Sequence, residues 1–359
     1  MILSDRLCRR CREMTGEMES RKENQWIHRF RLAAALMVVA IHIGPFMVVN
    51  ETADYLITYC LFRVAVPFFL MVAGYFVLSA PGQVGNYVAK MIRLYAFATI
   101  LYLPVNWYAG KQIGGITGVL RDIFLDGTFY HLWYFPAVIL GCLIVMALIR
   151  LCGELQSGIL VSILYIAGTL GDSYGGLVMG TDIGRNFYDQ IFSISDYTRN
   201  GLFYAPLFLW MGVIFRRKKG QNWPKDLIGL GISLLLMLTE GALTYEKGWQ
   251  RHNSMYFALP LVMYFLFSIL LSGAAHSNKR KGTMDKKWRE LSLWIYLLHP
   301  LCIILVRGMA RTVGLTKVLV ENTMLHYLAV CAISVGVSAV ICLLVERIRH
   351  WQGKGRGKE

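Results

Sequence analysis

Ten runs of apolar residues, most of them long enough to cross a lipid bilayer, constrain this chain more than any other feature. A bilayer core about 30 Å thick is crossed by about 20 residues of α-helix, which satisfies its own backbone hydrogen bonds. With 56% hydrophobic and 16% charged residues, the chain does not have the composition of a soluble domain. We therefore predict an all-α, polytopic membrane helix bundle of about ten transmembrane helices. The runs lie at 31–49, 55–79, 91–108, 132–150, 157–174, 201–215, 226–244, 255–273, 290–307 and 325–345.

Basic residues predict how these spans are oriented. Cytoplasmic loops carry an excess of Lys and Arg, and here alternate loops hold the clusters at 90–93, 216–219 and 279–289. The net charge of +15 is therefore an orientation signal rather than a nucleic-acid patch. We expect both termini in the cytoplasm and the chain in a bacterial plasma membrane. The expected organisation is a polar cytoplasmic segment at 1–25, a membrane domain at 26–347 and a basic cytoplasmic tail at 348–359.

Two smaller features complete this organisation. The segment 110–130 is too polar to cross a membrane but has apolar residues at helical spacing, so we predict an amphipathic helix on the outer surface. Cys8 and Cys11 form a single C-x-x-C pair with no second half, and five other cysteines lie in apolar runs as small hydrophobes. No metal site is predicted.

The first apolar run contains two ionisable residues, Arg31 and His42. Eleven residues of helix rise roughly 16 Å and make nearly whole turns, so both side chains should project from one face. Such residues within a membrane are costly and usually functional. His42 is either a general base that takes a proton from a hydroxyl group or a histidine that hydrogen-bonds between helices. Arg31 taken alone would be an ordinary cytoplasmic anchor.

Three more basic residues lie in or beside the next two runs. Arg63 is well inside the second run, where exposing a guanidinium to lipid costs about 3 kcal/mol, so it should face the bundle interior at a depth near His42. Pro67 would bend this helix. Lys90 and Arg93 share a helix face at the cytoplasmic start of the third run. They either bind phosphate groups or belong only to the orientation signal.

Two histidines and a glutamate are further pathway or acceptor candidates. His299 lies mid-membrane beside Pro300, which frees a backbone carbonyl group. We rank it above His131, which opens the fourth run and is typical of a membrane interface. Glu240 lies near the outer end of the seventh run and is a candidate substrate contact.

Together these motifs resemble the acyltransferase 3 family of integral membrane acyltransferases, from about residue 26 to residue 347. Lys90 stands where that family usually has arginine. Several motifs resemble even more closely the membrane half of VanT-type membrane-bound serine racemases. Those racemases also have a soluble pyridoxal-phosphate domain, and we expect neither that domain nor racemisation here. The motifs are Arg31-x10-His42, the run from Arg63 to Phe76, the pair Lys90 and Arg93, His131-Leu-Trp-Tyr-Phe, and Tyr296-Leu-Leu-His-Pro.

The resemblance implies an acyltransferase that moves an acyl group, commonly acetyl, from cytoplasmic acyl-coenzyme A to a hydroxyl of an envelope carbohydrate or similar acceptor at the outer face. It implies that His42 is the catalytic base or relay, that Arg31 is its essential partner, and that Lys90 and Arg93 contact the donor. Acyl-coenzyme A would be a co-substrate, no cofactor would be bound, and no nucleic acid is expected among the partners.

Two other functions fit the same residues. The membrane half of VanT-type proteins is thought to handle serine, so an amino-acid transport or sensing module is the alternative, and buried His and Arg residues suit solute passage equally well. A structural membrane partner is the third. An acyltransferase consumes a thioester, whereas a transporter moves its solute without one.

Overall fold

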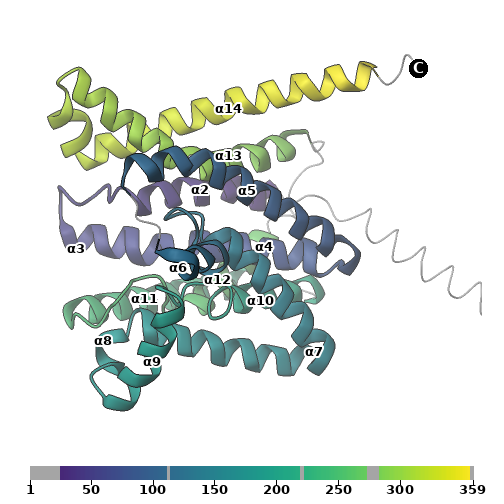
Figure 1. Ribbon diagram of the computed structural model, residues 1–359. Coiled ribbons are helices and arrows are strands. Elements are labelled where there is room, and N and C mark those ends of the chain that lie inside the picture. The colour runs from purple at the N-terminus through teal and green to yellow at the C-terminus, as the bar shows by residue number, and fades with distance from the viewer. Residues whose placement is uncertain (1–24, 111–113, 219–221, 273–282, 356–359) are drawn as a thin grey trace, which may run out of the picture.

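The computed structural model describes residues 25–110, 114–218, 222–272 and 283–355, and these residues form helices and connecting turns with no strand. Cys8, Cys11 and residues 279–282 of the basic cluster at 279–289 lie outside them. The helices pack side by side in a bundle (Figure 1). In chain order they are α2 (Gln25–Ile41), α3 (Glu51–Asp54), η1 (Tyr55–Cys60), η2 (Leu61–Val64), α4 (Ala65–Ala73), η3 (Gly74–Leu78), η4 (Pro81–Gln83), α5 (Val84–Tyr108), α6 (Gly115–Arg121), η5 (Asp122–Asp126), α7 (Tyr134–Asp172), α8 (Gly175–Val178), α9 (Asp182–Ile194), α10 (Ala205–Arg217), α11 (Trp223–Glu246), α12 (Leu259–Ser272), α13 (Thr283–Thr312), η6 (Lys317–Glu321) and α14 (Thr323–Gly355).

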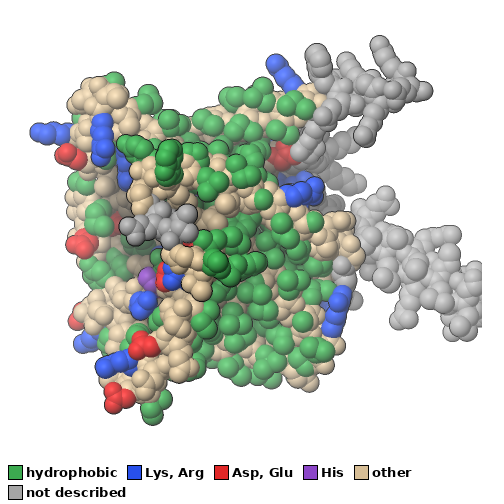
Figure 2. Space-filling view, in the orientation of Figure 1, with side chains coloured by type: hydrophobic (Ala, Val, Ile, Leu, Met, Phe, Trp, Pro, Cys, Tyr) green, Lys and Arg blue, Asp and Glu red, His purple; other side chains and the backbone are tan. Residues whose placement is uncertain are grey.

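Within the described residues, six helical segments are long and apolar enough to cross a membrane. Figure 2 shows apolar side chains over the middle of the visible face, with charged side chains gathered toward its two ends. The predicted all-α, membrane-capable fold is therefore confirmed, whereas the count of ten spans and the cytoplasmic termini stay predictions. The six segments are Glu51–Leu78, Val84–Tyr108, Tyr134–Asp172, Trp223–Glu246, Lys287–Thr312 and Thr323–Ile348.

Two helix boundaries differ from the predicted runs, and one predicted break is present. The first helix spans Gln25–Ile41 rather than 31–49, because Gly44 adopts a left-handed φ of 68° and Pro45 follows it. The runs at 132–150 and 157–174 both lie in α7, and Gly153, with a non-helical φ of 80° and ψ of 178°, divides this segment into two helices between the two predicted runs. Helix α14 continues to Gly355, well into the predicted tail.

The second predicted span is helical throughout but irregular. Residues 51–78 pass from α-helix to a π-helix, then to a 3₁₀ turn that contains Arg63, then to α-helix and to a second π-helix. Pro67 has no N–H with which to bond the carbonyl group of Arg63, four residues earlier, so regular α-helical bonding is broken at that turn. The bend predicted from Pro67 thus takes the form of a local change of helix type.

Two close contacts fix the helices that carry the candidate site. Gly74 and Gly212 let the second span and α10 approach backbone to backbone; a Cβ on Gly212 would lie 2.2 Å from the carbonyl oxygen of Met71. The second contact is a buried apolar cluster that joins α2 to α13 and α14, with Val39 and Ile295 among its members. The carboxyl end of α2 is therefore held against the middle of α13.

Candidate functional site

Three histidines that are far apart in the sequence meet in the structure. His42 follows the last residue of α2, His131 precedes α7, and His299 lies within α13. The ring centroids of His42 and His299 are 5.2 Å apart and the rings are nearly parallel; the centroids of His131 and His299 are also 5.2 Å apart. Tyr130 places its ring centroid 4.8 Å from that of His42. We call His42, His131 and His299 the histidine cluster.

The sequence Tyr296-Leu-Leu-His-Pro explains how His299 is oriented. Pro300 has no N–H, so the carbonyl oxygen of Tyr296 is free of its usual helical bond. The Nδ1 atom of His299 is 2.8 Å from that oxygen and 3.2 Å from the carbonyl oxygen of Ile295. Carbonyl oxygens only accept hydrogen bonds, so Nδ1 carries the proton. In the neutral ring Nε2 is then unprotonated, and Nε2 is buried with no partner among the described residues.

The three rings differ in their access to solvent. His299 and His131 are buried, at 0% and 1% exposure, whereas His42 is partly exposed beside Tyr130, which is 46% exposed. A molecule that approaches the cluster therefore meets His42 first. His131, which the sequence placed at a membrane interface, is enclosed by aromatic rings, among them Tyr102 and Tyr296.

The cluster is suited to proton transfer more than to metal binding. Among the described residues, no carboxylate hydrogen-bonds to any of its rings, and no group of three His, Cys, Asp or Glu side chains could hold a metal ion. Neutral imidazoles with one unengaged nitrogen take and return protons near neutral pH. The arrangement can therefore deprotonate a hydroxyl group.

A pair of arginines lies beside the cluster. Arg63 donates from Nη2 to the Oδ1 atom of Asn253 at 2.7 Å, and Arg199, from the loop before α10, donates from Nη1 to the Oγ atom of Ser254 at 3.1 Å. The two guanidinium groups thus contact neighbouring residues of one loop, and both are close enough to interact electrostatically with His42. We call Arg63 and Arg199 the arginine pair.

Arg31, Lys90 and Arg93 lie away from the histidine cluster. Arg31 is separated from His42 by about 16 Å along α2 and interacts electrostatically with Tyr87, which is one turn before Lys90 on α5. Lys90 and Arg93 are exposed, and the Nε atom of Arg93 donates to the backbone oxygen of Ala89 at 3.3 Å. The structure therefore separates the predicted donor contacts from the predicted base.

The Glu240 carboxylate accepts hydrogen bonds from the loop before α12. Its Oε1 atom accepts hydrogen bonds from the hydroxyl of Tyr174 at 3.0 Å and from the N–H of Phe257 at 2.7 Å, and Oε2 accepts one from the N–H of Ala258 at 2.9 Å. Both oxygens are occupied, so this carboxylate fixes the loop that carries Asn253.

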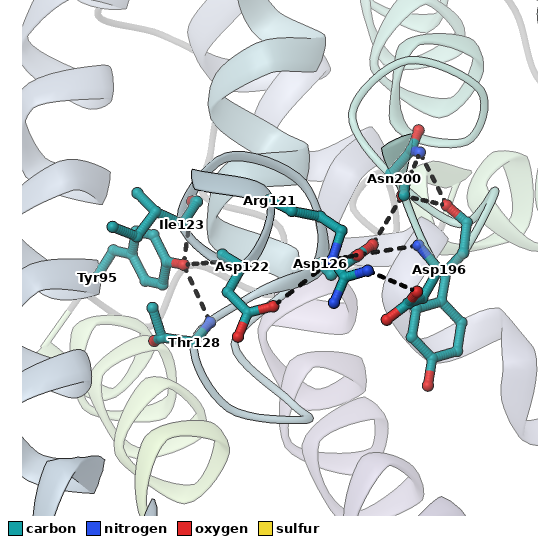
Figure 3. A network of polar contacts seen from close by, with 10 residues as sticks. Tyr95, Arg121, Asp122, Ile123, Asp126, Thr128, Asp196 and Asn200 are labelled. Atoms are coloured by element: carbon teal, nitrogen blue, oxygen red, sulfur yellow. Dashed lines mark hydrogen bonds and ion pairs between the residues drawn. The ribbon is translucent and has the colours of Figure 1, made fainter. Parts of the chain in front are cut away.

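A polar network fixes the two loops that carry His131 and Arg199 (Figure 3). Asp126 accepts hydrogen bonds from the hydroxyl of Ser195 at 2.7 Å and from the N–H of Asp196 at 2.9 Å. Arg121 forms an ion pair with Asp196 at 3.1 Å. The predicted surface helix at 110–130 is present as α6 and η5, which bury none of their residues; its amino-terminal part, at 111–113, lies outside the described residues.

Arg199, Asn253 and Tyr130 were not singled out from the sequence. Each lies in a loop between apolar runs, where polar and aromatic residues are ordinary, so no local pattern marks them.

Comparison with known proteins identifies relatives over nearly the whole chain. Residues 24–343 match the acyltransferase 3 model, described as an acyltransferase domain. The chain is 36% identical over 343 residues to a serine/alanine racemase of Enterococcus gallinarum, which covers 92% of this chain and 47% of that protein. It is 34% identical over 336 residues to an amino-acid racemase of Enterococcus faecalis, with 91% and 46% covered. The chain spans slightly less than half the length of these relatives, and no solved structure matches it.

Proposed function

Because this chain belongs to the acyltransferase 3 family of membrane acyltransferases, we propose that it transfers an acyl group, with acetyl expected, from cytoplasmic acyl-coenzyme A to a hydroxyl of an envelope carbohydrate or similar acceptor at the outer face of the plasma membrane. The observation that carries this proposal is the histidine cluster, in which the partly exposed imidazole of His42 lies nearly parallel to the ring of His299, whose unprotonated Nε2 atom is buried with no partner among the described residues.

In the proposed reaction, His42 takes the proton of the acceptor hydroxyl as its oxygen attacks the thioester carbonyl carbon. The new ester C–O bond forms, the C–S bond breaks, and the coenzyme A thiolate leaves and takes up the proton. His299 stacks behind His42 and offers a neutral acceptor rather than a second charge, so it supports a transient imidazolium.

Donor binding is assigned to the region of Arg31, Lys90 and Arg93. These cations suit the phosphates of coenzyme A, and the flexible arm of coenzyme A separates its phosphates from its thioester. The donor can therefore contact both regions at once. In this proposal Arg31 supports catalysis by holding the donor rather than by touching His42.

The test compares inside-out membrane vesicles that contain wild type, His42→Ala or His326→Ala. Each preparation holds native envelope extract in its lumen, on the acceptor side, and receives radiolabelled acetyl-coenzyme A from the medium. His326 is a buried histidine of α14 that bonds to Arg307, and it serves as the matched control. Labelled envelope material is expected with wild type and the control but not with His42→Ala. Full labelling with an inserted His42→Ala protein would refute the base assignment.

Amino-acid transport or sensing is the second candidate, and the names of the racemase relatives favour it. It predicts uptake of labelled L-serine by proteoliposomes without any thioester. Uptake together with no turnover of acetyl-coenzyme A would replace the first proposal by the second.

A further inference from the structure

We infer that the arginine pair binds an oxyanion, a carboxylate or phosphate group, carried by the acceptor, so that the acceptor is an anionic hydroxyl compound rather than a neutral one. This inference rests on the proposed function, because it names the substrate class for the same site. Its starting point is that the hydrogen-bond partners of both guanidinium groups are neutral side chains.

Neither arginine has an anionic partner within ion-pair distance among the described residues. Each donates one hydrogen bond to a neutral side-chain oxygen, and each keeps a buried Nε atom that bonds to none of the described residues. A buried donor without a partner costs about 1–3 kcal/mol, and more for a charged group. Two such donors so close together indicate a site that is completed by a ligand.

The local charge balance favours an anion. Arg63 and Arg199 are close enough to repel each other, and Asp172 is a carboxylate that attracts Arg199. Its Oδ1 atom accepts from the N–H groups of Ser254 at 2.6 Å and Met255 at 3.0 Å, and its Oδ2 atom is buried with no hydrogen-bond partner among the described residues, so Asp172 sets one negative charge against the two cations. Burial lowers the pKa of His252, which also neighbours the pair, so its ring adds no positive charge at neutral pH. One uncompensated positive charge is left.

The surrounding rings hold the guanidinium planes in place. Arg199 lies over Tyr197 at 4.2 Å from the ring centroid and over Trp133 at 5.4 Å, and Arg63 lies 5.5 Å from the centroid of Tyr59. Stacked guanidinium groups lose little freedom when they bind, and their donors match the geometry of carboxylate and phosphate oxygens. Because His42 interacts with both cations, an anion bound here would present a neighbouring hydroxyl to that imidazole.

The test measures binding to purified full-length protein in nanodiscs, without acyl-coenzyme A, so that its result does not depend on turnover. The probes form three matched pairs: L-serine and L-serinamide, D-glucuronate and D-glucose, and glucose 6-phosphate and D-glucose. We expect at least one anionic probe to bind at least about tenfold more tightly than its neutral partner. The pair that shows the difference distinguishes an amino acid, an acidic sugar and a phosphorylated sugar.

Variants identify the residues responsible. Arg63→Gln and Arg199→Gln should each remove the difference, and Arg63→Lys should restore only part of it, because lysine keeps the charge but not the fork of donors. Arg185→Gln, an exposed arginine on α9, is the matched control and should retain it. Since the pair is mutually repulsive, neither Gln variant should lower the thermal unfolding midpoint, which separates loss of a ligand contact from loss of the fold.

Three results would overturn the inference. They are equal binding of the anionic and neutral partners, a difference that persists in both Gln variants, and no saturable binding of any probe up to about 10 mM. The proposed function can fail separately, since oxyanion binding without acetyl-coenzyme A turnover would contradict acyl transfer while leaving the anion site in place.

Discussion

His299→Asn tests the proposed proton path without removing the contact that holds the ring in place. The Nδ2 atom of asparagine occupies the position of Nδ1 and still donates to the carbonyl oxygen of Tyr296, but nothing replaces Nε2. If Nε2 supports the protonation of His42, acyl transfer should fall by at least about 100-fold, the lower end of general acid–base effects, while the free energy of unfolding stays nearly unchanged.

His299→Leu supplies the comparison, because it removes both nitrogens. The carbonyl oxygen of Tyr296 then has neither a side-chain donor nor an N–H from Pro300, and a buried unsatisfied group costs about 1–3 kcal/mol of stability. Pro300→Ala restores an N–H at that position. It should therefore stabilise the His299→Leu protein more than it stabilises wild type, and this difference is the coupling that a double-mutant cycle measures.

Both readouts use the same set of variants. Transfer is followed with radiolabelled acetyl-coenzyme A in inside-out vesicles, and stability by denaturant titration of the protein in bicelles. Near-normal transfer by His299→Asn would refute the role of Nε2. Equal stabilisation by Pro300→Ala in the two backgrounds would refute the assignment of the freed carbonyl group.

The remaining predictions concern the donor region, a loop network and the helix packing. Lys90→Ala combined with Arg93→Ala should raise the KM for acetyl-coenzyme A with little change in kcat. An unchanged KM would mean that these two residues do not bind the donor and serve only in the basic charge that orients the protein in the membrane. Burial raises the pKa of the Asp126 carboxyl group above its usual 3.8, so the folded protein keeps this group protonated to higher pH than the unfolded chain does. The stability that this group contributes therefore falls as pH rises through the raised pKa. Asp126→Asn should flatten that part of a plot of melting temperature against pH. Gly212→Ala should lower the melting temperature by forcing α10 away from the second span, whereas Gly231→Ala, where a Cβ would meet nothing within 4 Å, should leave it unchanged or raise it.

The fold class was predictable because apolar runs of bilayer length leave few alternatives to helices. The helix ends were less predictable. Residues 46–49 are apolar enough to extend the first run, but the left-handed Gly44 and Pro45 end the helix before them. The break between the runs at 132–150 and 157–174 was predictable, and it falls at Gly153, whose φ of 80° is not helical.

The candidate site was predictable only where an ionisable residue interrupts an apolar run. His42, His299 and Arg63 met that condition. The freed carbonyl group beside Pro300 was expected from the sequence, but its bond to the histidine ring was not. Arg199 lies in a polar loop, so its role depends on tertiary contacts that no local pattern encodes.

The loop that carries Asn253 and Ser254 is tied at one point to Asp172, at the end of α7, and at another to Glu240 on α11. Both guanidinium groups of the arginine pair rest on this loop, so their separation follows the spacing of two helices whose tilt responds to the thickness of the surrounding lipid. The proposed anion site therefore predicts an affinity that depends on membrane thickness. Measurements in short-chain and long-chain lipids should accordingly give different binding constants for the same chain.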